Sequence, residues 1–284
     1  MTKEMRYGDD YKKLPVYSKN SGEGVEVRPD IYVFTDQIVN LVFIGRPEDN
    51  EFVIVDAGMP KRADEIIEAA YERFGEKAKA KAIILTHGHF DHVGSVIELI
   101  EEWDAPVYAH PLEMPYLTGE SPYPKPDMSV EGGMVAKMSP IFPTNPIDLG
   151  DSVQLIPKDG SLPHLPHFKW VHVPGHTPGQ IALYRSADRV LISADAIVTT
   201  RQEDLTKVLT QRVEISGPPR YLTTDWDAAK LSAQILYELK PDYLISGHGQ
   251  PVEGEELKEG LERLINNWDE LALPDHGRYV DDKD

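Results

Sequence analysis

The sequence predicts a protein of the α/β class, in which helices alternate with buried strands. Apolar runs and amphipathic stretches alternate between Glu51 and His110. Several short apolar runs with tight turns follow between 151 and 195, and they indicate a second sheet. Two long amphipathic stretches, 225–239 and 254–271, predict helices. With 284 residues, 40% of them hydrophobic, the chain is long enough to bury a substantial core.

The first 25 residues are polar and irregular, and the regular elements are expected to begin after them. "VEVRPDIYVFTD" and "IVNLVFIGR" predict two strands, and "EFVIVDAG" predicts a third that ends at Asp56. "KRADEIIEAAYERFG" has apolar residues at three- and four-residue spacing, which predicts an amphipathic helix that stops at Gly75. "KAIILTH", "GSVIELIEEW" and "PVYAH" then predict strand, helix and strand. In such a unit, functional loops lie at the carboxyl ends of the strands.

A proline-rich stretch follows, with eight prolines between 111 and 150. We expect it to be a loop-rich insertion, acting either as a wall of the active site or as a packing arm. The sequence thus predicts an irregular segment over 1–25, one domain over 26–272 with this insertion, and an acidic tail over 273–284.

The later strands are predicted by "DSVQLIP", "FKWVHVPG", "QIALYR" and "RVLISAD", which we assign to the second sheet. Asp225 is the expected N-cap of a helix whose apolar face carries Ala228, Leu231, Ile235 and Leu239. A last strand, "YLIS", leads into a Gly-His-Gly turn at 247–249.

Composition restricts the function. The formal charge of −19 and the lack of Lys/Arg clusters argue against nucleic acid and anionic membranes as partners. We expect a cytoplasmic protein that acts on a small molecule, since the charged N-terminus has no apolar signal region and no apolar run is long enough to span a membrane. The chain has no cysteine, so a metal site must use His, Asp and Glu.

Four potential metal ligands lie within six residues of "THGHFDH": His87, His89, Asp91 and His92. Neutral imidazole and carboxylate are ligands of zinc and iron where thiolate is absent. So short a loop cannot offer all four groups to one tetrahedral ion, which suggests two neighbouring ions.

Other strand ends carry the same residue types. His176 follows a strand in "VHVPGHTPGQ", Asp195 ends "VLISAD", and His248 ends "YLISGHG". Asp56 has the same placement. A rigid sheet would present such residues to a shared site, so the sequence predicts a dinuclear metal centre.

These motifs resemble those of the metallo-β-lactamase superfamily. "THGHFDH" matches its HxHxDH signature, and "PGHTPGQ", "SAD" and "SGHG" follow in the order of that family, over residues 26 to 252. The resemblance implies a four-layer αββα sandwich of two mixed β-sheets flanked by helices.

The resemblance also implies the role of each residue. His87, His89 and His176 would hold the first metal, Asp91, His92 and His248 the second, and Asp195 would bridge them. Asp56 would orient a ligand histidine instead of binding metal. The expected cofactors are two divalent ions, with zinc favoured and iron or manganese as alternatives. A bridging hydroxide would be the nucleophile, and Asp91 the carrier of its proton.

Differences from known members of the superfamily restrict the classes of substrate that we expect. The commonest β-lactamases carry cysteine where Asp195 stands, flavo-diiron proteins carry Glu at the position of His89, and lactonases usually carry tyrosine at the position of Val198. The prediction is a hydrolase of a small ester, thioester or lactone. A phosphodiesterase and a mononuclear iron sulfur dioxygenase are the alternatives. The roles of His164 and His167, and the formation of a homo-oligomer, are left open.

Overall fold

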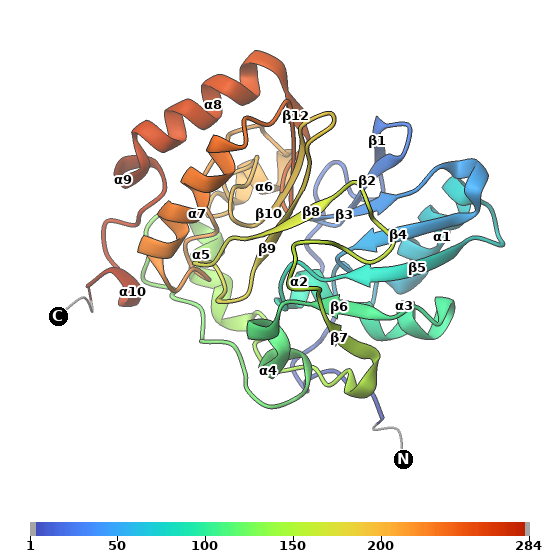
Figure 1. The fold of residues 1–284 in the computed structure, drawn as a ribbon. Helices are drawn as coiled ribbons and strands as arrows, with labels where there is room; N and C mark the ends of the chain where they lie inside the picture. Colours follow the sequence, from blue (N-terminus) through green and yellow to red (C-terminus); the bar gives the residue numbers. More distant parts are fainter. Residues whose placement is uncertain (1–3, 282–284) are drawn as a thin grey trace. The chain divides into compact units, whose positions relative to one another are not determined.

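A computed structural model describes residues 4–281 of the chain (Figure 1). The chain divides into two compact units. Unit 1 comprises Met1–Tyr123 and Pro143–Pro166, and unit 2 comprises Pro124–Phe142 and His167–Asp284. The proline-rich stretch is therefore shared, with 124–142 in unit 2 and its flanks in unit 1. The single domain over 26–272 stays a prediction.

Unit 1 contains a seven-stranded mixed sheet with the strands in sequence order. The first four strands pair antiparallel and the remaining ones parallel. The strands are β1 (Gly24–Arg28), β2 (Ile31–Asp36), β3 (Val39–Ile44), β4 (Glu51–Val55), β5 (Lys79–Ile84), β6 (Val107–Ala109) and β7 (Val153–Leu155).

Two details of this sheet correct the sequence-based assignment. The stretch from Val25 to Asp36 was expected to be one strand, but it forms the hairpin β1–β2, which turns at Pro29 and Asp30. Proline fixes its own φ and has no amide hydrogen for a ladder, which favours the turn. The strand β7 was assigned to the second sheet, yet it pairs parallel with β6. Strand partners are chosen by tertiary packing, which local periodicity does not encode.

The helices of unit 1 follow the predicted pattern. The α-helices are α1 (Ala63–Phe74), α2 (Phe90–Val93), α3 (Val96–Trp103) and α4 (Met114–Leu117), and the 3-10 helices are η1 (Pro47–Asp49), η2 (Pro111–Glu113) and η4 (Gly150–Ser152). At the end of α1, the Gly75 amide donates to the Tyr71 carbonyl at 2.8 Å, as expected of a helix stop. Helices α1 and α3 contact each other and the sheet. Phe52 of β4 stacks on Phe74 of α1 at 4.7 Å, and such aromatic packing fixes helix against sheet.

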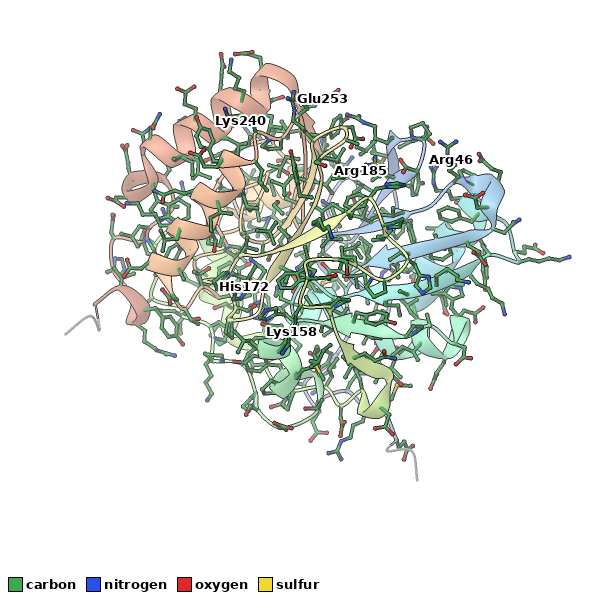
Figure 2. The ribbon with its side chains drawn as sticks, in the orientation of Figure 1. Arg46, Lys158, His172, Arg185, Lys240 and Glu253 are labelled. Carbon is green, nitrogen blue, oxygen red and sulfur yellow. The ribbon has the colours of Figure 1, made fainter. Side chains whose placement is uncertain are left out.

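Unit 2 contains a five-stranded mixed sheet in the order β12-β11-β10-β9-β8. Only the pair of β10 and β11 is parallel. The strands are β8 (Lys169–His172), β9 (Ile181–Arg185), β10 (Val190–Ala194), β11 (Tyr243–Ser246) and β12 (Val252–Glu253). Arg185, labelled in Figure 2, ends β9. Its guanidinium binds Asp188 at 2.7 Å and lies over the Phe168 ring, which closes the turn between β9 and β10.

The helices of unit 2 are α5 (Met134–Met138), α6 (Leu205–Thr210), α7 (Trp226–Glu238), α8 (Gly254–Asn266), α9 (Trp268–Leu271) and α10 (Arg278–Asp281), with the 3-10 helix η3 (Ser139–Ile141). The predicted helix over 254–271 is therefore broken at Asn267. The stretch expected to be an acidic tail begins inside the unit, because the Arg278 amide donates to Asp127 at 2.6 Å.

Helix α7 confirms its predicted N-cap but not its predicted face. The Asp225 side chain accepts from the Ala228 amide at 2.9 Å. Leu231 and Ile235, however, are 60% and 46% exposed. The buried side chains of α7 are Trp226, Ala229, Ser232, Ala233 and Leu236. Three of these five side chains, Ala229, Ser232 and Ala233, are small, which allows close packing, whereas periodicity alone favoured the stripe of larger residues.

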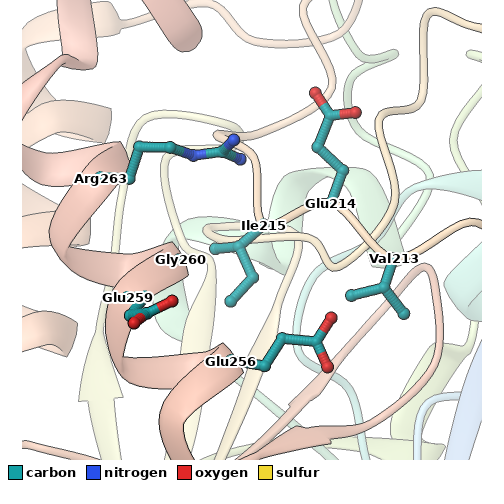
Figure 3. A pocket seen from close by; sticks show the side chains of 7 residues that line it. All are labelled: Val213, Glu214, Ile215, Glu256, Glu259, Gly260 and Arg263. Atoms are coloured by element: carbon teal, nitrogen blue, oxygen red, sulfur yellow. The ribbon is translucent and has the colours of Figure 1, made fainter.

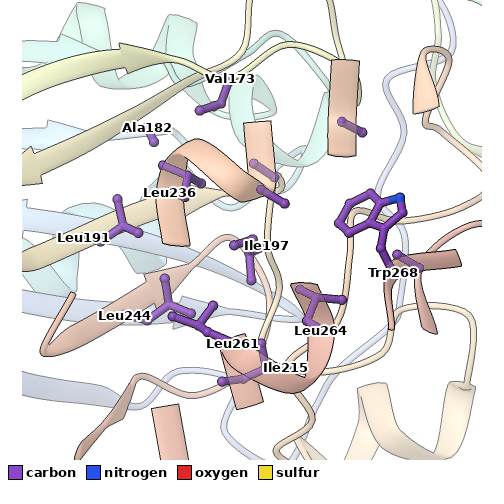
Figure 4. Close-up of a cluster of buried hydrophobic side chains, with 14 of the residues drawn as sticks. Val173, Ala182, Leu191, Ile197, Ile215, Leu236, Leu244, Leu261, Leu264 and Trp268 are labelled. Atoms are coloured by element: carbon purple, nitrogen blue, oxygen red, sulfur yellow. The ribbon is translucent and has the colours of Figure 1, made fainter. Parts of the chain in front are cut away.

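The core of unit 2 forms between its sheet and its long helices (Figure 4). Leu191 and Leu244 come from the strands, Leu261 and Leu264 from α8, and Trp268 from α9; all are almost completely buried. Two mixed sheets with flanking helices confirm the α/β class. Among residues 4–281, no helix is both long and apolar enough to cross a membrane.

Candidate metal centre

Asp56 lies directly after β4 in a left-handed backbone conformation, with φ of 64°. Asp is one of the few non-glycine residues that tolerate this region. The Asp56 carboxylate is buried and accepts three hydrogen bonds. They come from the Thr86 amide at 2.7 Å, the Thr86 hydroxyl at 2.8 Å and His92 Nδ1 at 2.8 Å. Asp56 thereby fixes the orientation of His92, which is the contact that its predicted role requires.

Thr86 extends this network to His87. Its hydroxyl donates to Asp56, so its oxygen can accept from His87 Nδ1, which lies 3.1 Å away. We therefore assign the proton of both His87 and His92 to Nδ1. In this tautomer Nε2 carries a lone pair, as metal coordination requires.

The predicted ligands of unit 1 lie close together. The ring centroid of His87 is 4.8 Å from that of His89 and 4.1 Å from that of His92. All three rings and Asp91 are buried. Helix α2 carries Asp91 and His92 on one short turn.

This turn is fastened to the loop after β4. The Ala57 amide donates to the His92 carbonyl at 2.7 Å, and the Gly94 amide donates to the Gly58 carbonyl at 2.8 Å. The approach at Gly94 is so close that a Cβ there would lie 2.2 Å from the Pro60 nitrogen. Glycine at 94 is therefore a steric requirement.

The N-terminal segment also reaches this region. Burial raises the pKa of Tyr11, and the negative charges of Asp10 and Asp91 raise it further. Asp10 accepts from the Thr144 amide at 2.8 Å, which ties the segment to the end of the proline-rich stretch within unit 1. Tyr11 was not among the predicted site residues, because nothing in its local sequence marks it.

Unit 2 brings its three predicted ligands together. Oδ2 of Asp195 lies 3.5 Å from Nε2 of His176 and 3.3 Å from Nε2 of His248. All three side chains are at most 3% exposed. His176 follows β8, Asp195 follows β10, and His248 follows β11, so the ends of one sheet position them.

A bulge in β10 presents Asp195. The pairing with β11 shifts register between Ile192 and Ala194, and Ala194 has φ of 49°. Positive φ is costly for alanine and persists only where the surroundings hold it. The Gly247 amide donates to the Ala194 carbonyl at 2.9 Å, and the Ser193 hydroxyl donates to the Ile197 carbonyl at 2.7 Å. A bulge held in this way re-aims the following side chain.

Two threonines support the histidines of unit 2. The Thr223 hydroxyl donates to the Pro219 carbonyl at 2.8 Å, so its oxygen can accept from His176 Nδ1 at 3.1 Å. His176 Nε2 is thereby left with the lone pair that a metal requires. The Thr199 hydroxyl lies within 2.9 Å of the Ser246 hydroxyl and donates to the Gln250 carbonyl at 2.7 Å, which holds the turn around His248.

The two supporting residues Thr86 and Thr223 differ in how far the sequence could have indicated them. Thr86 directly precedes His87, and a hydroxyl beside a ligand histidine could have been suspected. Thr223 lies 47 residues from His176, so the sequence held no signal for that pair.

The donor groups within each unit are of the kinds that bind divalent ions. Buried His and Asp groups able to hold a metal are His87, His89, Asp91 and His92 in unit 1, and His176, Asp195 and His248 in unit 2. Imidazole nitrogen and carboxylate oxygen, without thiolate, are ligands for zinc, iron or manganese.

Comparison with known proteins gives the family. Residues 34–248 match the model of the metallo-β-lactamase superfamily. The chain belongs to this superfamily. The probable metallo-hydrolase YflN of Bacillus subtilis (strain 168) is 46% identical over 254 residues, which cover 89% of this chain and 96% of YflN. Members of the superfamily bind metal ions, and the chain is a metallo-hydrolase of this fold.

Solved structures agree with that fold. The B3 metallo-β-lactamase BLEG-1 is 25% identical with a TM-score of 0.54, and the match covers 84% of this chain and 97% of BLEG-1. TTHA1623, solved in a di-iron-bound form, is 26% identical with a TM-score of 0.50, and the match covers 83% of this chain and 96% of that one.

Four of the five remaining histidines make other contacts. His110 Nδ1 accepts from the Leu112 amide at 3.3 Å and caps η2. His172 Nε2 lies 2.9 Å from the Pro178 carbonyl, and His276 lies 3.7 Å from Glu131. His164 lines a cavity of about 420 Å³ in unit 1, together with Asp49, Glu51 and Lys81 among other residues.

Unit 2 contains a cavity of similar size, about 420 Å³, shown in Figure 3. It is lined by Val213, Glu214, Ile215, Glu256, Glu259, Gly260 and Arg263. None of the predicted metal ligands lines it. The candidate site is therefore the His/Asp set, not this cavity.

Proposed function

We propose that this metallo-hydrolase cleaves a small-molecule ester, thioester or lactone at a dinuclear centre, with a bridging hydroxide as nucleophile. The observation that carries the proposal is the position of Asp195 between His176 and His248, with one carboxylate oxygen within 3.5 Å of both imidazoles. A carboxylate so placed suits a bridge between two ions.

The proposed ligands of the first ion are His87, His89 and His176. Those of the second are Asp91, His92 and His248, and Asp195 is the proposed bridge. Zinc is the proposed ion, and iron is the first alternative because TTHA1623 was solved with two irons. When bound, the ions would lower the pKa of a shared water and polarise the scissile carbonyl.

The residues of the chain have separate tasks in this proposal. Asp56, Thr86 and Thr223 hold imidazole Nδ1 protons, which keeps each Nε2 available. Asp91, buried on α2, would bind through one carboxylate oxygen and use the other to take the proton of the nucleophile. That proton would then pass to the leaving group.

The proposed partner is a small molecule, not nucleic acid or a membrane. The net charge of −19 opposes the approach of polyanions. Val198 is buried at the position where lactonases usually carry a phenol, so a lactone would have to be polarised by another group. Esters and thioesters are therefore the first substrates to try.

Metal analysis combined with a hydrolysis screen tests the proposal. The purified protein is assayed for metal content and for turnover of esters, thioesters, lactones, phosphodiesters and a cephalosporin. We expect two ions per chain and turnover of a carboxyl ester or thioester. His89→Ala should lower both metal content and turnover, whereas the matched control His276→Ala changes an exposed histidine outside the proposed ligand set and should alter neither.

Other results would redirect the assignment. A phosphodiester or β-lactam turned over far faster than every carboxyl ester would reverse the order of substrates. One iron per chain together with oxygen uptake would indicate the sulfur dioxygenase. Full metal content and full turnover in His89→Ala would refute the proposed centre.

A further inference from the structure

The start of the proline-rich stretch packs against the loop that carries His87 and His89. Residues 111–123 belong to unit 1, and there they form η2 and α4. Two buried side chains from this segment, Glu113 and Tyr123, meet Gly88, the residue between the two histidines.

The contact is made to the backbone of the loop. The Gly88 amide donates to Glu113 Oε2 at 3.0 Å and to the Tyr123 hydroxyl oxygen at 2.9 Å. The Tyr123 hydroxyl in turn donates to Glu113 Oε2. The three groups form a closed triangle in which one carboxylate oxygen accepts from both a phenol and an amide. A hydrogen bond to a carboxylate is stronger than one between neutral groups.

The Tyr123 ring makes a second contact. Its centroid lies 4.4 Å from that of His89, and the ring also stacks on Tyr116 at 3.8 Å. The glycine at 88 makes this approach possible. A Cβ at Gly88 would lie 2.8 Å from the Tyr123 hydroxyl and 3.2 Å from Leu117, so a side chain would push the ring away.

We propose that Glu113 and Tyr123 are positioning residues for the metal-binding pair His87 and His89. They hold the peptide between the two histidines, and Tyr123 also packs on the ring of His89. The direction of each imidazole depends on that peptide, because a rotation there would swing the two side chains apart. The inference rests on the proposed metal centre. It means that the first part of the proline-rich stretch positions the loop that carries His87 and His89.

The alternative is that the triangle only satisfies buried polar groups of the core. Both roles predict some loss of stability when a hydroxyl is removed. Only the positioning role predicts that a protein which still folds will bind metal more weakly and with altered ligand geometry. Groups that orient ligands typically change metal affinity by about 10- to 100-fold.

The test is Tyr123→Phe, which keeps the ring stack and removes the hydroxyl. Its matched control is Tyr116→Phe, which removes a hydroxyl from the neighbouring ring of the stack. The Tyr116 hydroxyl makes no hydrogen bond to a described residue. Zinc dissociation constants are measured by chelator competition on metal-stripped full-length protein, and thermal unfolding verifies the fold. The visible spectrum of the Co²⁺-loaded protein reports ligand geometry.

We expect Tyr123→Phe to raise at least one zinc dissociation constant by about tenfold and to shift the Co²⁺ absorption bands. Tyr116→Phe should stay within about twofold of the wild type. Glu113→Gln keeps an acceptor oxygen but loses the charge, and it should shift both readouts in the same direction as Tyr123→Phe. This variant serves as the test if Tyr123→Phe does not fold.

The inference is overturned if the folded variants at 113 and 123 bind zinc and display Co²⁺ bands as the wild type does. A wild-type protein that binds no metal would overturn the proposed function and this inference together. A wild type that binds two ions while Tyr123→Phe is unchanged would leave the proposed function intact and refute only the positioning role.

Discussion

Replacing Asp56 by Asn should destabilise the metal-free protein, because three donors converge on this one buried carboxylate. They are the Thr86 amide, the Thr86 hydroxyl and His92 Nδ1, at 2.7, 2.8 and 2.8 Å. Asparagine has nearly the same shape but only one acceptor oxygen. Its amino group would therefore face at least one of these donors.

The magnitude follows from the bonds that are lost. The least costly orientation turns the amide nitrogen toward the Thr86 amide and leaves that donor buried and unsatisfied, at roughly 1–3 kcal/mol. The other two bonds lose the charge of their acceptor, at roughly 0.5–1 kcal/mol each. We expect Asp56→Asn to lower the free energy of unfolding by about 3 kcal/mol in total.

Urea unfolding of the metal-free protein at pH 8 measures this change. Asp225→Asn is the matched control, because the N-cap of α7 accepts a single amide and Asn caps as well as Asp. The control should stay within about 0.5 kcal/mol of the wild type. A loss below about 1 kcal/mol in Asp56→Asn would show that this network does not hold the loop as described.

Three further changes have defined outcomes. Burial raises the pKa of Asp36 from 3.8 to about 6, so the folded state holds this proton more tightly than the unfolded state does. The unfolding free energy of the wild type minus that of Asp36→Asn should therefore fall by about 3 kcal/mol in total as the pH rises from about 3 to about 7, and stay level above. Thr223→Val removes the acceptor of the His176 Nδ1 proton and should weaken zinc binding by about tenfold in a chelator competition. Gly94→Ala places a Cβ 2.2 Å from the Pro60 backbone nitrogen, and urea unfolding should show a loss of about 3 kcal/mol or more.

Each of these has its own control or refuting result. A pH-independent difference between the wild type and Asp36→Asn would mean that Asp36 does not carry the raised pKa. Thr210→Val removes a threonine hydroxyl on the exposed side of α6 and should leave zinc affinity unchanged. If Thr210→Val and Thr223→Val bound zinc equally, the support of His176 would be excluded. A fully stable Gly94→Ala would contradict the close approach of the two loops.

The local signals of the sequence were sufficient for most of the elements and for the position of the candidate ligands along the chain. Apolar periodicity and Gly75 predicted α1, and Asp225 predicted the start of α7. His87, Asp195 and His248 were expected at strand ends and lie there. These features depend on residues a few positions apart, and capping, helix periodicity and strand termination are encoded at that range.

Tertiary structure alone decided which elements and side chains meet. The pairing of β7 with β6 and the burial of Ala229 in place of Leu231 depend on the partner surface. A periodic pattern indicates that a face exists, but packing between distant segments selects the face that is buried.

The hydrogen bonds that hold the candidate metal ligands also depend partly on local sequence and partly on tertiary structure. The sequence by itself determined the donor types of the candidate site, because the types and spacing of its His and Asp residues define that set. The contacts of Thr223 with His176 and of Tyr123 with Gly88 join residues 47 and 35 positions apart. Such contacts form only when the chain has folded, because hydroxyl and carboxyl groups are common and local sequence does not say which donor each will meet.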